Sequence, residues 1–535
     1  MFRGEHSLLV VATSPLASLI FALSVALSIS FVLYGMNILH LTRRAKRYRE
    51  PISDKPSEKP AVAVHLPVYN EFYVAGRLVE SCVSMAEQYG KDLVKIYIID
   101  DSDDETREEI DDLSSRFTSA GYNIEVIRRG TRAGFKAGAL QAALERTKEP
   151  FIAVFDADFC PPANFLDRTV ACLIRDEKVG FVQCRWSHFD RNYNVITETL
   201  AIGVDAHFLL EQPGRWGSGY LMNFNGSAGL LRREAILKAG GWQSDTLAED
   251  LDLSYRMQLA GCTAVYLRDL NVPAELPPTI TSLKRQQGRW ARGSIQTARK
   301  VMPSLIHSGS LSYTQKFEAV MHLTYYLVHP LMVASFLLAV IATFLNIDVI
   351  KYAVAVSLPT FASPSDLLRG FNLKNVTYLT FQVAPWLVFS ALVVLSTIAV
   401  LYYCAEAVRV QNMGLVRNIK EIFLLVILGY GISISNSVSV LSGLFSNRTG
   451  TFLRTPKYAI TRKDHSWREK KYQLSLNRVS ILEGVAVAIS ALAITKAIAT
   501  SNLGIIPILA VYASGYILVF ALTLLQSLRS SKTTE

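Results

Sequence analysis

Acidic side chains gather at three places where an apolar run of the sequence ends. "LPVYNE" (66–71) follows a first run, "IIDDSDDET" (98–106) follows a second, and "FDADF" (155–159) follows a later one. Carboxylates repel one another when they collect at one edge, so acidic clusters of this kind favour a bound cation. The spacing of Asp156 and Asp158 lets one carboxylate bind a divalent ion while the other accepts from a hydroxyl. One such pair also arises by chance, and an acid after a strand is often a helix N-cap.

A lysine and a second acidic pair add to this chemistry. Lys136 lies in "TRAGFKAGAL", where small residues let a ligand approach the backbone and a cation suits a phosphate. A solvated helix lysine is the plain alternative. Glu249 and Asp250 are adjacent in "TLAEDLDLSYRM" (246–257). They indicate either an ordinary helix start or a general base that takes a proton from an acceptor.

Polar and aromatic residues also occur at the boundary between two parts of the chain, here called the seam. The stretch is "LKRQQGRWARGSIQTARKV" (283–301), which contains Gln286, Arg289 and Trp290. The sequence before this stretch reads as a soluble domain, and the sequence after it is mostly apolar. The helical pattern that follows Trp290 predicts an interfacial helix lying on a bilayer. Its expected apolar side consists of Ile295, Ala298, Met302 and Leu305.

The elements that position these residues follow from periodicity. Between 61 and 185, apolar β-branched runs alternate with helical patterns, which predicts a mostly parallel sheet covered on both faces. Ligands bind at the carboxyl ends of such strands. The expected strands are "AVAVHLP", "LVKIYIID", "YNIEVIRR", "FIAVFDAD" and "VGFVQCRW", and the clearest helical patterns are "GRLVESCVSMAEQYG" and "GFKAGALQAALERT".

Composition places this domain in a membrane protein. The chain has 535 residues, which predicts two or three domains, and 50% of them are hydrophobic. The net charge of +10 fits basic loops beside apolar segments better than a nucleic-acid surface, so no nucleic-acid partner is expected. Six cysteines form no CxxC pair and no Cys/His metal spacing, which predicts free thiols and no zinc site.

The first membrane segment is predicted at residues 16–41, which carry no formal charge and are long enough to cross a bilayer. Five Lys or Arg follow between Arg43 and Arg49. This order differs from that of a signal peptide and predicts an uncleaved anchor. The positive-inside rule places the N-terminus outside and the chain from residue 50 in the cytoplasm, as in a multi-pass protein of the plasma membrane.

The later apolar stretches predict four more spans. Nine Lys or Arg between 446 and 478 indicate a cytoplasmic loop, and the basic residues near Arg409 indicate the same. The Ser- and Asn-rich stretch 422–445 between them is therefore predicted to be re-entrant or interfacial. A six-span chain with a flipped tail is the alternative. The predicted spans are about 319–345, 382–404 and a hairpin of 479–499 with 504–528.

This reasoning predicts four regions. They are the anchor and its basic flank (1–49), a cytoplasmic domain (50–282), the seam with its helix (283–310), and a membrane region (311–535) that contains the basic loop 446–478.

The motifs occur in an order that resembles membrane-embedded family-2 glycosyltransferases. The likeness is to cellulose synthase-like enzymes of the glucomannan and xyloglucan-backbone type and their prokaryotic relatives. It covers about 61–310, and "FLRTPKYAI" (452–460) looks like the gating-loop region of the family. Ala248 departs from the family, which usually has Thr before the Glu-Asp pair. The chain also has fewer apparent spans than cellulose synthases. The carrying motifs are "LPVYNE", "IIDDS", "GFKAGAL", "FDADF", "FNGSAGLLRREAI", "AGGW", "AEDLDLSYRM" and "QQGRW".

The resemblance implies an α/β GT-A-type, Rossmann-like cytoplasmic domain joined to an α-helical transmembrane region. It also implies a role for each motif residue. On the donor side, Asp101 with its neighbour Asp100 would bind the nucleotide base, Glu71 would lie in the base and ribose pocket, Lys136 near the nucleotide, Asp156 at ribose or sugar, and Asp158 on a divalent cation, Mg²⁺ or Mn²⁺. On the acceptor side, Asp250 would be the general base, Gln286 and Arg289 would hold the acceptor and the diphosphate end, and Trp290 would stack on the acceptor sugar.

The implied function is transfer of a hexose, with inversion, from UDP-glucose or GDP-mannose to a growing β-glycan at the cytoplasmic membrane face, with processive export. One alternative is a single transfer to a lipid, as in ceramide glucosyltransferases. Another is a transporter or scaffold with an inactive domain, against which the intact motif residues argue. The expected partners are the nucleotide sugar, a glycan or lipid acceptor and membrane lipids. The sequence leaves the oligomeric state open.

Overall fold

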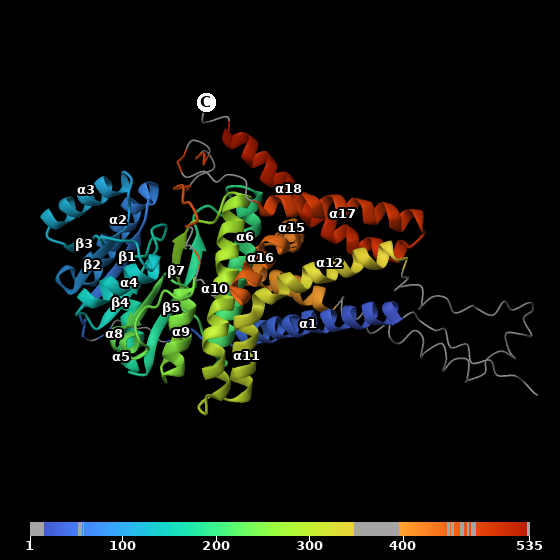
Figure 1. Cartoon of the computed structure of the whole chain (residues 1–535). Helices are drawn as coiled ribbons and strands as arrows, with labels where there is room; N and C mark the ends of the chain where they lie inside the picture. Colours follow the sequence, from blue (N-terminus) through green and yellow to red (C-terminus); the bar gives the residue numbers. More distant parts are fainter. Residues whose placement is uncertain are drawn as a thin grey trace, which may run out of the picture.

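The computed structural model places a sheet region at one end of the molecule and a group of projecting helices at the other (Figure 1). It describes residues 15–51, 56, 58–346, 395–446, 450, 454–460, 465–467, 470–471 and 478–531.

The sheet has seven strands in the order β3-β2-β1-β4-β6-β5-β7. Strands β1 to β4 are parallel, β6 is antiparallel to both of its neighbours, and β5 is parallel to β7. The predicted, mostly parallel sheet is therefore confirmed. The strands are β1 (Val62–Val68), β2 (Val94–Asp100), β3 (Asn123–Ile127), β4 (Phe151–Val154), β5 (Val179–His188), β6 (Gly229–Arg232) and β7 (Thr263–Ala274).

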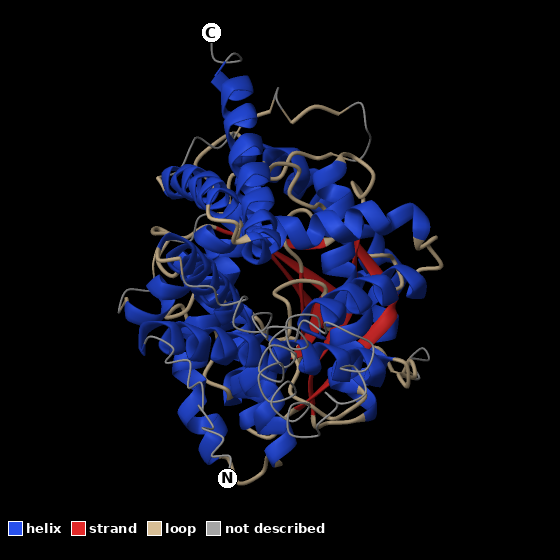
Figure 2. Ribbon diagram, turned by 90° about the vertical axis from the view of Figure 1, so that its right-hand side faces the viewer, coloured by secondary structure: helices blue, strands red, loops and turns tan. Residues whose placement is uncertain are grey.

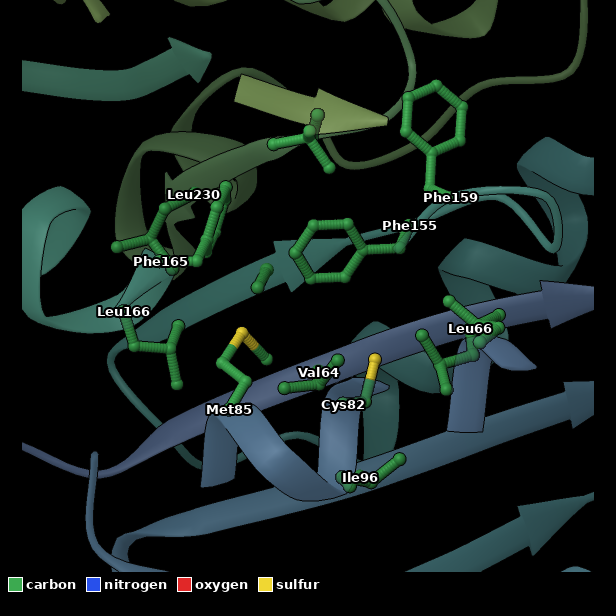
Figure 3. Packing of buried hydrophobic residues seen from close by; sticks show 14 of the residues in the cluster. Val64, Leu66, Cys82, Met85, Ile96, Phe155, Phe159, Phe165, Leu166 and Leu230 are labelled. Atoms are coloured by element: carbon green, nitrogen blue, oxygen red, sulfur yellow. The ribbon is translucent and has the colours of Figure 1, made fainter. Parts of the chain in front are cut away.

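Helices cover both faces of this sheet (Figure 2). On one face, Val64 of β1, Ile96 of β2 and Phe155 after β4 pack against Cys82 and Met85 of α2 (Figure 3). Helices α4 and α9 contribute apolar residues to the cluster on the other face. The helices of this region are α2 (Phe72–Tyr89), α3 (Thr106–Ser119), α4 (Phe135–Arg146), α5 (Phe165–Arg175), α6 (Val195–Ala206), α7 (Gln212–Trp216), α8 (Arg233–Lys238) and α9 (Glu249–Leu259), with short turns η1 (Lys91–Leu93) and η2 (His207–Glu211).

Helix α10 (Ile280–His307) runs across the molecule between the sheet region and the projecting helices (Figure 1). Ile295, Ala298 and Leu305 are buried, and Met302 packs beside them, in contacts with α9, α11 and α16. The expectation that this side of the helix lies on lipid is therefore wrong. Periodicity identified the side of the helix that is buried, but it does not distinguish a cover of protein from a cover of lipid.

Four helical segments are long and apolar enough to cross a membrane: Ala22–Ala45, Tyr313–Phe344, Val479–Ala499 and Leu503–Leu528. They coincide with four of the five predicted spans. The first part of the remaining one, 382–404, lies outside the described residues, and its later part belongs to a helix over 395–410. The elements are α1 (Pro15–Ala45), α11 (Tyr313–Thr324), η3 (Tyr325–Leu327), α12 (Val328–Phe344), α17 (Val479–Ala499), η6 (Leu503–Ile505) and α18 (Ile506–Ser531).

A bent pair of helices occupies the stretch that the sequence predicted to be re-entrant. Val416–Gly431 and Ser433–Phe445 meet at 50° and comprise η5 (Val416–Asn418), α15 (Ile419–Gly431) and α16 (Ser433–Phe445). Before the pair, Gln411 donates to Asp205 of α6 at 3.0 Å. After it, Lys457 donates to Asp158 behind β4 at 2.6 Å. Both flanks contact the sheet region, and by length and composition the pair is either one broken span or a re-entrant loop.

Candidate active site

A pocket opens at the carboxyl edge of the sheet. Its walls come from the loops after β1, β2 and β4, the first turns of α4 and α9, helix α10 and the segment 454–460. Nine of the ten predicted site residues line it, namely Glu71, Asp101, Lys136, Asp156, Asp158, Asp250, Gln286, Arg289 and Trp290. The structure therefore brings together residues that lie far apart in the sequence.

Asp100 and Asp101 are adjacent but have different surroundings. Asp100 is buried outside the pocket lining, where it accepts from Arg128 Nε at 2.8 Å and from the backbone N–H of Ser102 at 3.0 Å. Asp101 does line the pocket, and its two carboxylate oxygens accept from Arg129. Of this pair, only Asp101 is placed to meet a ligand in the pocket.

Lys136 lies among carboxylates at the start of α4. Its Nζ is 2.6 Å from Asp156 Oδ1 and 3.5 Å from Glu249 Oε1, and it donates to the carbonyl of Gly226 at 2.9 Å. Burial alone would lower the pKa of Lys136. The nearby carboxylates of Asp156, Glu249 and Asp250 have a larger effect in the opposite direction, so the pKa is raised and the ammonium stays charged. A fixed positive charge in this pocket suits a phosphate.

Asp250 shares this charged corner. Gly226 has a φ of 80°, and a Cβ built there would lie 2.7 Å from Asp250 Oδ2, so only glycine allows this approach. Burial and the neighbouring Glu249 raise the pKa of Asp250 to about 7, although Lys136 opposes the shift. A carboxylate that titrates near neutrality is suited to accept a proton at neutral pH.

Asp158 has a basic partner from the far end of the sequence. Its Oδ2 accepts from Lys457 Nζ at 2.6 Å and from the backbone N–H of Glu275 at 3.0 Å. Glu71 lies nearby, and burial raises its pKa to about 7, with Arg454 opposing the shift.

The carboxylates of the pocket bear on whether it can hold a divalent cation. Within the described ranges, no group of three or more His, Cys, Asp or Glu side chains is placed to hold a metal by itself. Asp156 and Asp158 nevertheless offer carboxylate oxygens to one pocket. Mg²⁺ is often held by one or two carboxylates together with the phosphates of its substrate. The residues therefore fit a cation that binds together with a diphosphate.

Helix α10 supports the catalytic corner directly. Gln296 accepts from the backbone N–H of Leu247 at 3.0 Å, and a Cβ at Gly293 would lie 2.7 Å from that of Ala248. The position at which the chain departs from its relatives, Ala248, is thus packed against α10. At the other end of the helix, Lys284 pairs with Glu483 of α17 at 2.8 Å, and both side chains are buried. The pocket wall is consequently fixed to the membrane hairpin.

Several lining residues were missed as site residues by the sequence reasoning. Tyr69 and Arg132 lie inside motifs that were quoted, and the Arg132 guanidinium stands 3.2 Å from the centre of the Tyr69 ring. Arg454 and Lys457 lie in "FLRTPKYAI", which was noted without roles for its members. Glu275 carries no signal in the sequence, because it follows β7, a strand outside the range 61–185 in which the alternation predicts strands.

Comparison with known families identifies this arrangement. Residues 63–238 match the family model described as "Glycosyl transferase family 2". Residues 151–405 match the model described as "Glycosyl transferase family group 2". The chain contains a family 2 glycosyltransferase domain. The predicted α/β class of GT-A type, joined to helices able to cross a membrane, is confirmed.

The names of curated proteins similar to this chain agree with the resemblance seen in the motifs. The chain is 36% identical over 277 residues to "Probable glucomannan 4-beta-mannosyltransferase 7" of Oryza sativa subsp. japonica, covering 50% of this chain and 47% of the relative. It is 34% identical over 280 residues to "Glucomannan 4-beta-mannosyltransferase 2" of Arabidopsis thaliana, covering 51% and 52%. The matched region spans about half the length of these relatives.

A solved structure is also similar. It is a mannosyltransferase from Pyrobaculum calidifontis in complex with GDP-Man and Mn²⁺, with 19% identity and a TM-score of 0.47, and the match covers 71% of this chain and 98% of that one.

Proposed function

We propose that the chain is an inverting membrane hexosyltransferase that moves a sugar from a nucleotide sugar to a growing β-glycan. The observation that carries the proposal is the shared pocket of Lys136, Asp156, Asp158 and Asp250, bordered by Trp290 of α10. It combines positive charge for a diphosphate, oxygen ligands for a cation, a carboxylate of raised pKa and an aromatic wall.

On the donor side, Asp101 and Glu71 bind the base and ribose, and Asp156 contacts the ribose or the sugar. Asp158, with Asp156 beside it, would hold Mg²⁺ or Mn²⁺ together with the diphosphate. When bound, the cation neutralises the charge that develops on the leaving phosphate. Lys136 adds a fixed positive charge for the diphosphate, held in place by Asp156 and the carbonyl of Gly226.

On the acceptor side, Trp290 stacks on the apolar face of the acceptor sugar, and Gln286 and Arg289 hold the acceptor and the diphosphate end. Asp250 takes the proton of the acceptor hydroxyl. The hydroxyl oxygen forms the new bond to the anomeric carbon, and the bond from that carbon to the phosphate oxygen breaks. The nucleoside diphosphate leaves with the electron pair. Attack opposite the leaving group inverts the anomeric centre.

The relatives named as glucomannan mannosyltransferases support transfer of mannose, with GDP-mannose as donor and UDP-glucose as the alternative. The basic flank of α1 and the basic loop 446–478 support a cytoplasmic site on the plasma membrane. The attachment of α10 to α17 through Lys284 and Glu483 supports delivery of the product toward the membrane, as processive synthesis with export requires.

The test is to incubate the purified protein in lipid with a panel of UDP- and GDP-sugars and Mg²⁺ or Mn²⁺, and then to analyse the products. A glycan that lengthens with time supports processive transfer. A product that is soluble in organic solvent and carries a single added sugar would show that the acceptor is a lipid and not a glycan. Absence of nucleotide release from every donor would reject the enzyme in favour of an inactive scaffold.

A further inference from the structure

Glu275, the residue after β7, is a junction between the sheet and the segment 454–460. The residue is buried, with 6% exposure. Its Oε1 accepts from Arg77 at 2.7 Å. Its Oε2 accepts from two successive backbone N–H groups, those of Tyr458 and Ala459, each at 3.1 Å. One carboxylate therefore holds both a helix of the catalytic domain and a segment that follows the bent pair.

The main chain of Glu275 reaches the same place. Its N–H donates to Asp158 Oδ2 at 3.0 Å, and its carbonyl accepts from Lys457 Nζ at 3.1 Å. The same ammonium donates to Asp158 Oδ2 at 2.6 Å. Glu275 thus contacts both members of the Lys457–Asp158 ion pair.

The backbone of the segment 454–460 presents N–H groups to the carboxylate of Glu275. Tyr458 and Ile460 are each 1% exposed, so their backbone groups have little access to water. Ala459 has a φ of 53°, a left-handed conformation that is unusual for a residue with a side chain. Successive N–H groups next to such a residue converge on one anion. Without the carboxylate, the N–H groups of Tyr458 and Ala459 would lack this shared acceptor.

We propose that Glu275 is a positioning residue for sugar transfer. It fixes the segment 454–460 at the mouth of the pocket, so that Lys457 is held beside Asp158. The inference rests on the proposed function, because the group being positioned is the wall of the nucleotide-sugar pocket. Glu275 acts through its contacts with Lys457, Tyr458 and Ala459.

The test uses Glu275→Gln in the full-length protein in lipid. The amide keeps the shape of the side chain but removes the charge that the two N–H groups and Arg77 face. The KM for the nucleotide sugar is expected to rise about tenfold, because a lost charge-assisted hydrogen bond is commonly worth that factor. Donor hydrolysis should rise relative to transfer, and trypsin should cleave faster after Arg454 and Lys457. Bound donor should slow this cleavage less than in the wild type.

Glu318→Gln is the matched control, because Glu318 is a buried carboxylate paired with Arg215 at 2.8 Å and lies outside the pocket lining. It should lose similar thermal stability without faster cleavage after Lys457. Lys457→Met, alone and combined with Glu275→Gln, completes the set. If both residues act through the same docked loop, the KM of the double variant should equal that of the worse single variant.

The proposal is overturned if Glu275→Gln keeps both the normal KM and the normal cleavage rate. It is likewise overturned if the rise in KM of the double variant is the product of the rises in Glu275→Gln and Lys457→Met. It is also overturned if both Glu variants change KM and cleavage alike, since the role is then general stability. Should Glu275→Gln not fold, Lys457→Met breaks the contact from the loop side and must itself raise KM and expose Arg454. If the wild type uses no nucleotide sugar, the proposed function fails, while the cleavage arm still decides whether Glu275 docks the loop.

Discussion

Two lysine–carboxylate pairs line the pocket, and their members come from different parts of the chain. Lys136 and Asp156 meet at 2.6 Å and both belong to the sheet region. Lys457 and Asp158 also meet at 2.6 Å, but they lie 299 residues apart in the sequence. Between them in the sequence lie α10, the candidate span Tyr313–Phe344 and the bent pair Val416–Phe445. The first pair belongs to the catalytic domain alone, whereas the second requires the membrane region to be in place.

This difference shows which part of the chain supplies each charged residue of the pocket. The domain supplies the charged Lys136 and the proposed base Asp250 from its own residues. The region after residue 310 supplies the second lysine, Lys457, and holds α10, which bears Trp290 and is attached to α17 through Lys284. The pocket wall is thus attached to the helices that follow residue 310, and the following changes separate the two halves of the site.

The largest effect is expected at Asp158, where the two halves meet. Asp158→Ala should abolish turnover, because the cation at the diphosphate loses its carboxylate and Lys457 loses its partner. A chelator should abolish turnover of the wild type as well, with recovery on adding Mn²⁺ or Mg²⁺. Nucleotide release from a sugar nucleotide measures both. An active Asp158→Ala protein, or full activity in chelator, would contradict the cation assignment.

Asp250→Asn tests the domain half. The amide is nearly isosteric but cannot accept a proton, so transfer should fall by roughly 10²- to 10⁴-fold, while binding of the nucleotide sugar measured by calorimetry is retained. Asp245→Asn is the control, because Asp245 pairs with Lys300 outside the pocket lining. Normal transfer by Asp250→Asn would move the base to another residue, with Glu249 the first to test.

The two lysines can be compared directly by Lys136→Met and Lys457→Met. Lys136 faces Asp156, Glu249 and Asp250, so its loss should cost roughly 10²- to 10³-fold in transfer rate, as for other preorganised charges. Lys457→Met should cost roughly tenfold and should act mainly on the KM of the donor. Steady-state kinetics on both variants give the ratio. Equal losses would mean that the loop lysine belongs to the fixed chemical centre.

Much of the domain half could be predicted from the sequence, because local patterns encode it. Acidic residues after β1, β2 and β4 share the carboxyl edge of a parallel sheet, so their convergence follows from strand direction. Glu275 could not be predicted, since its role depends on a backbone segment, 454–460, that packs against it only in the fold. Asp100 was predicted as a site residue because it stands beside Asp101 in the same motif. Side chains alternate along a strand, however, so its carboxylate points away from the pocket and toward Arg128.

Trp290→Ala tests the connection through α10. Loss of the stacking surface should raise the KM for the acceptor about tenfold, equivalent to about 1.4 kcal/mol. Hydrolysis of the donor by water should continue at its normal slow rate, because the cation site and Asp250 are untouched. Parallel assays of hydrolysis and transfer measure the two outcomes. If both fall equally, Trp290 is packing at the seam and not an acceptor contact.

The smallest effect expected is a shift in the pH dependence of kcat/KM. It distinguishes the two lysines because it depends on the protonation of Asp250. Burial and Glu249 raise the pKa of Asp250 to about 7, with Lys136 opposing them. A general base works when deprotonated, so kcat/KM should rise with pH through about 7. Glu249→Gln removes a charge that raises this pKa and should move the midpoint to lower pH. Lys136→Met removes a charge that lowers it and should move the midpoint to higher pH, whereas Lys457→Met should leave it unchanged. Profiles measured from the initial rate of nucleotide release decide the matter: a midpoint that stays fixed in both Glu249→Gln and Lys136→Met would show that Asp250 is not the titrating base.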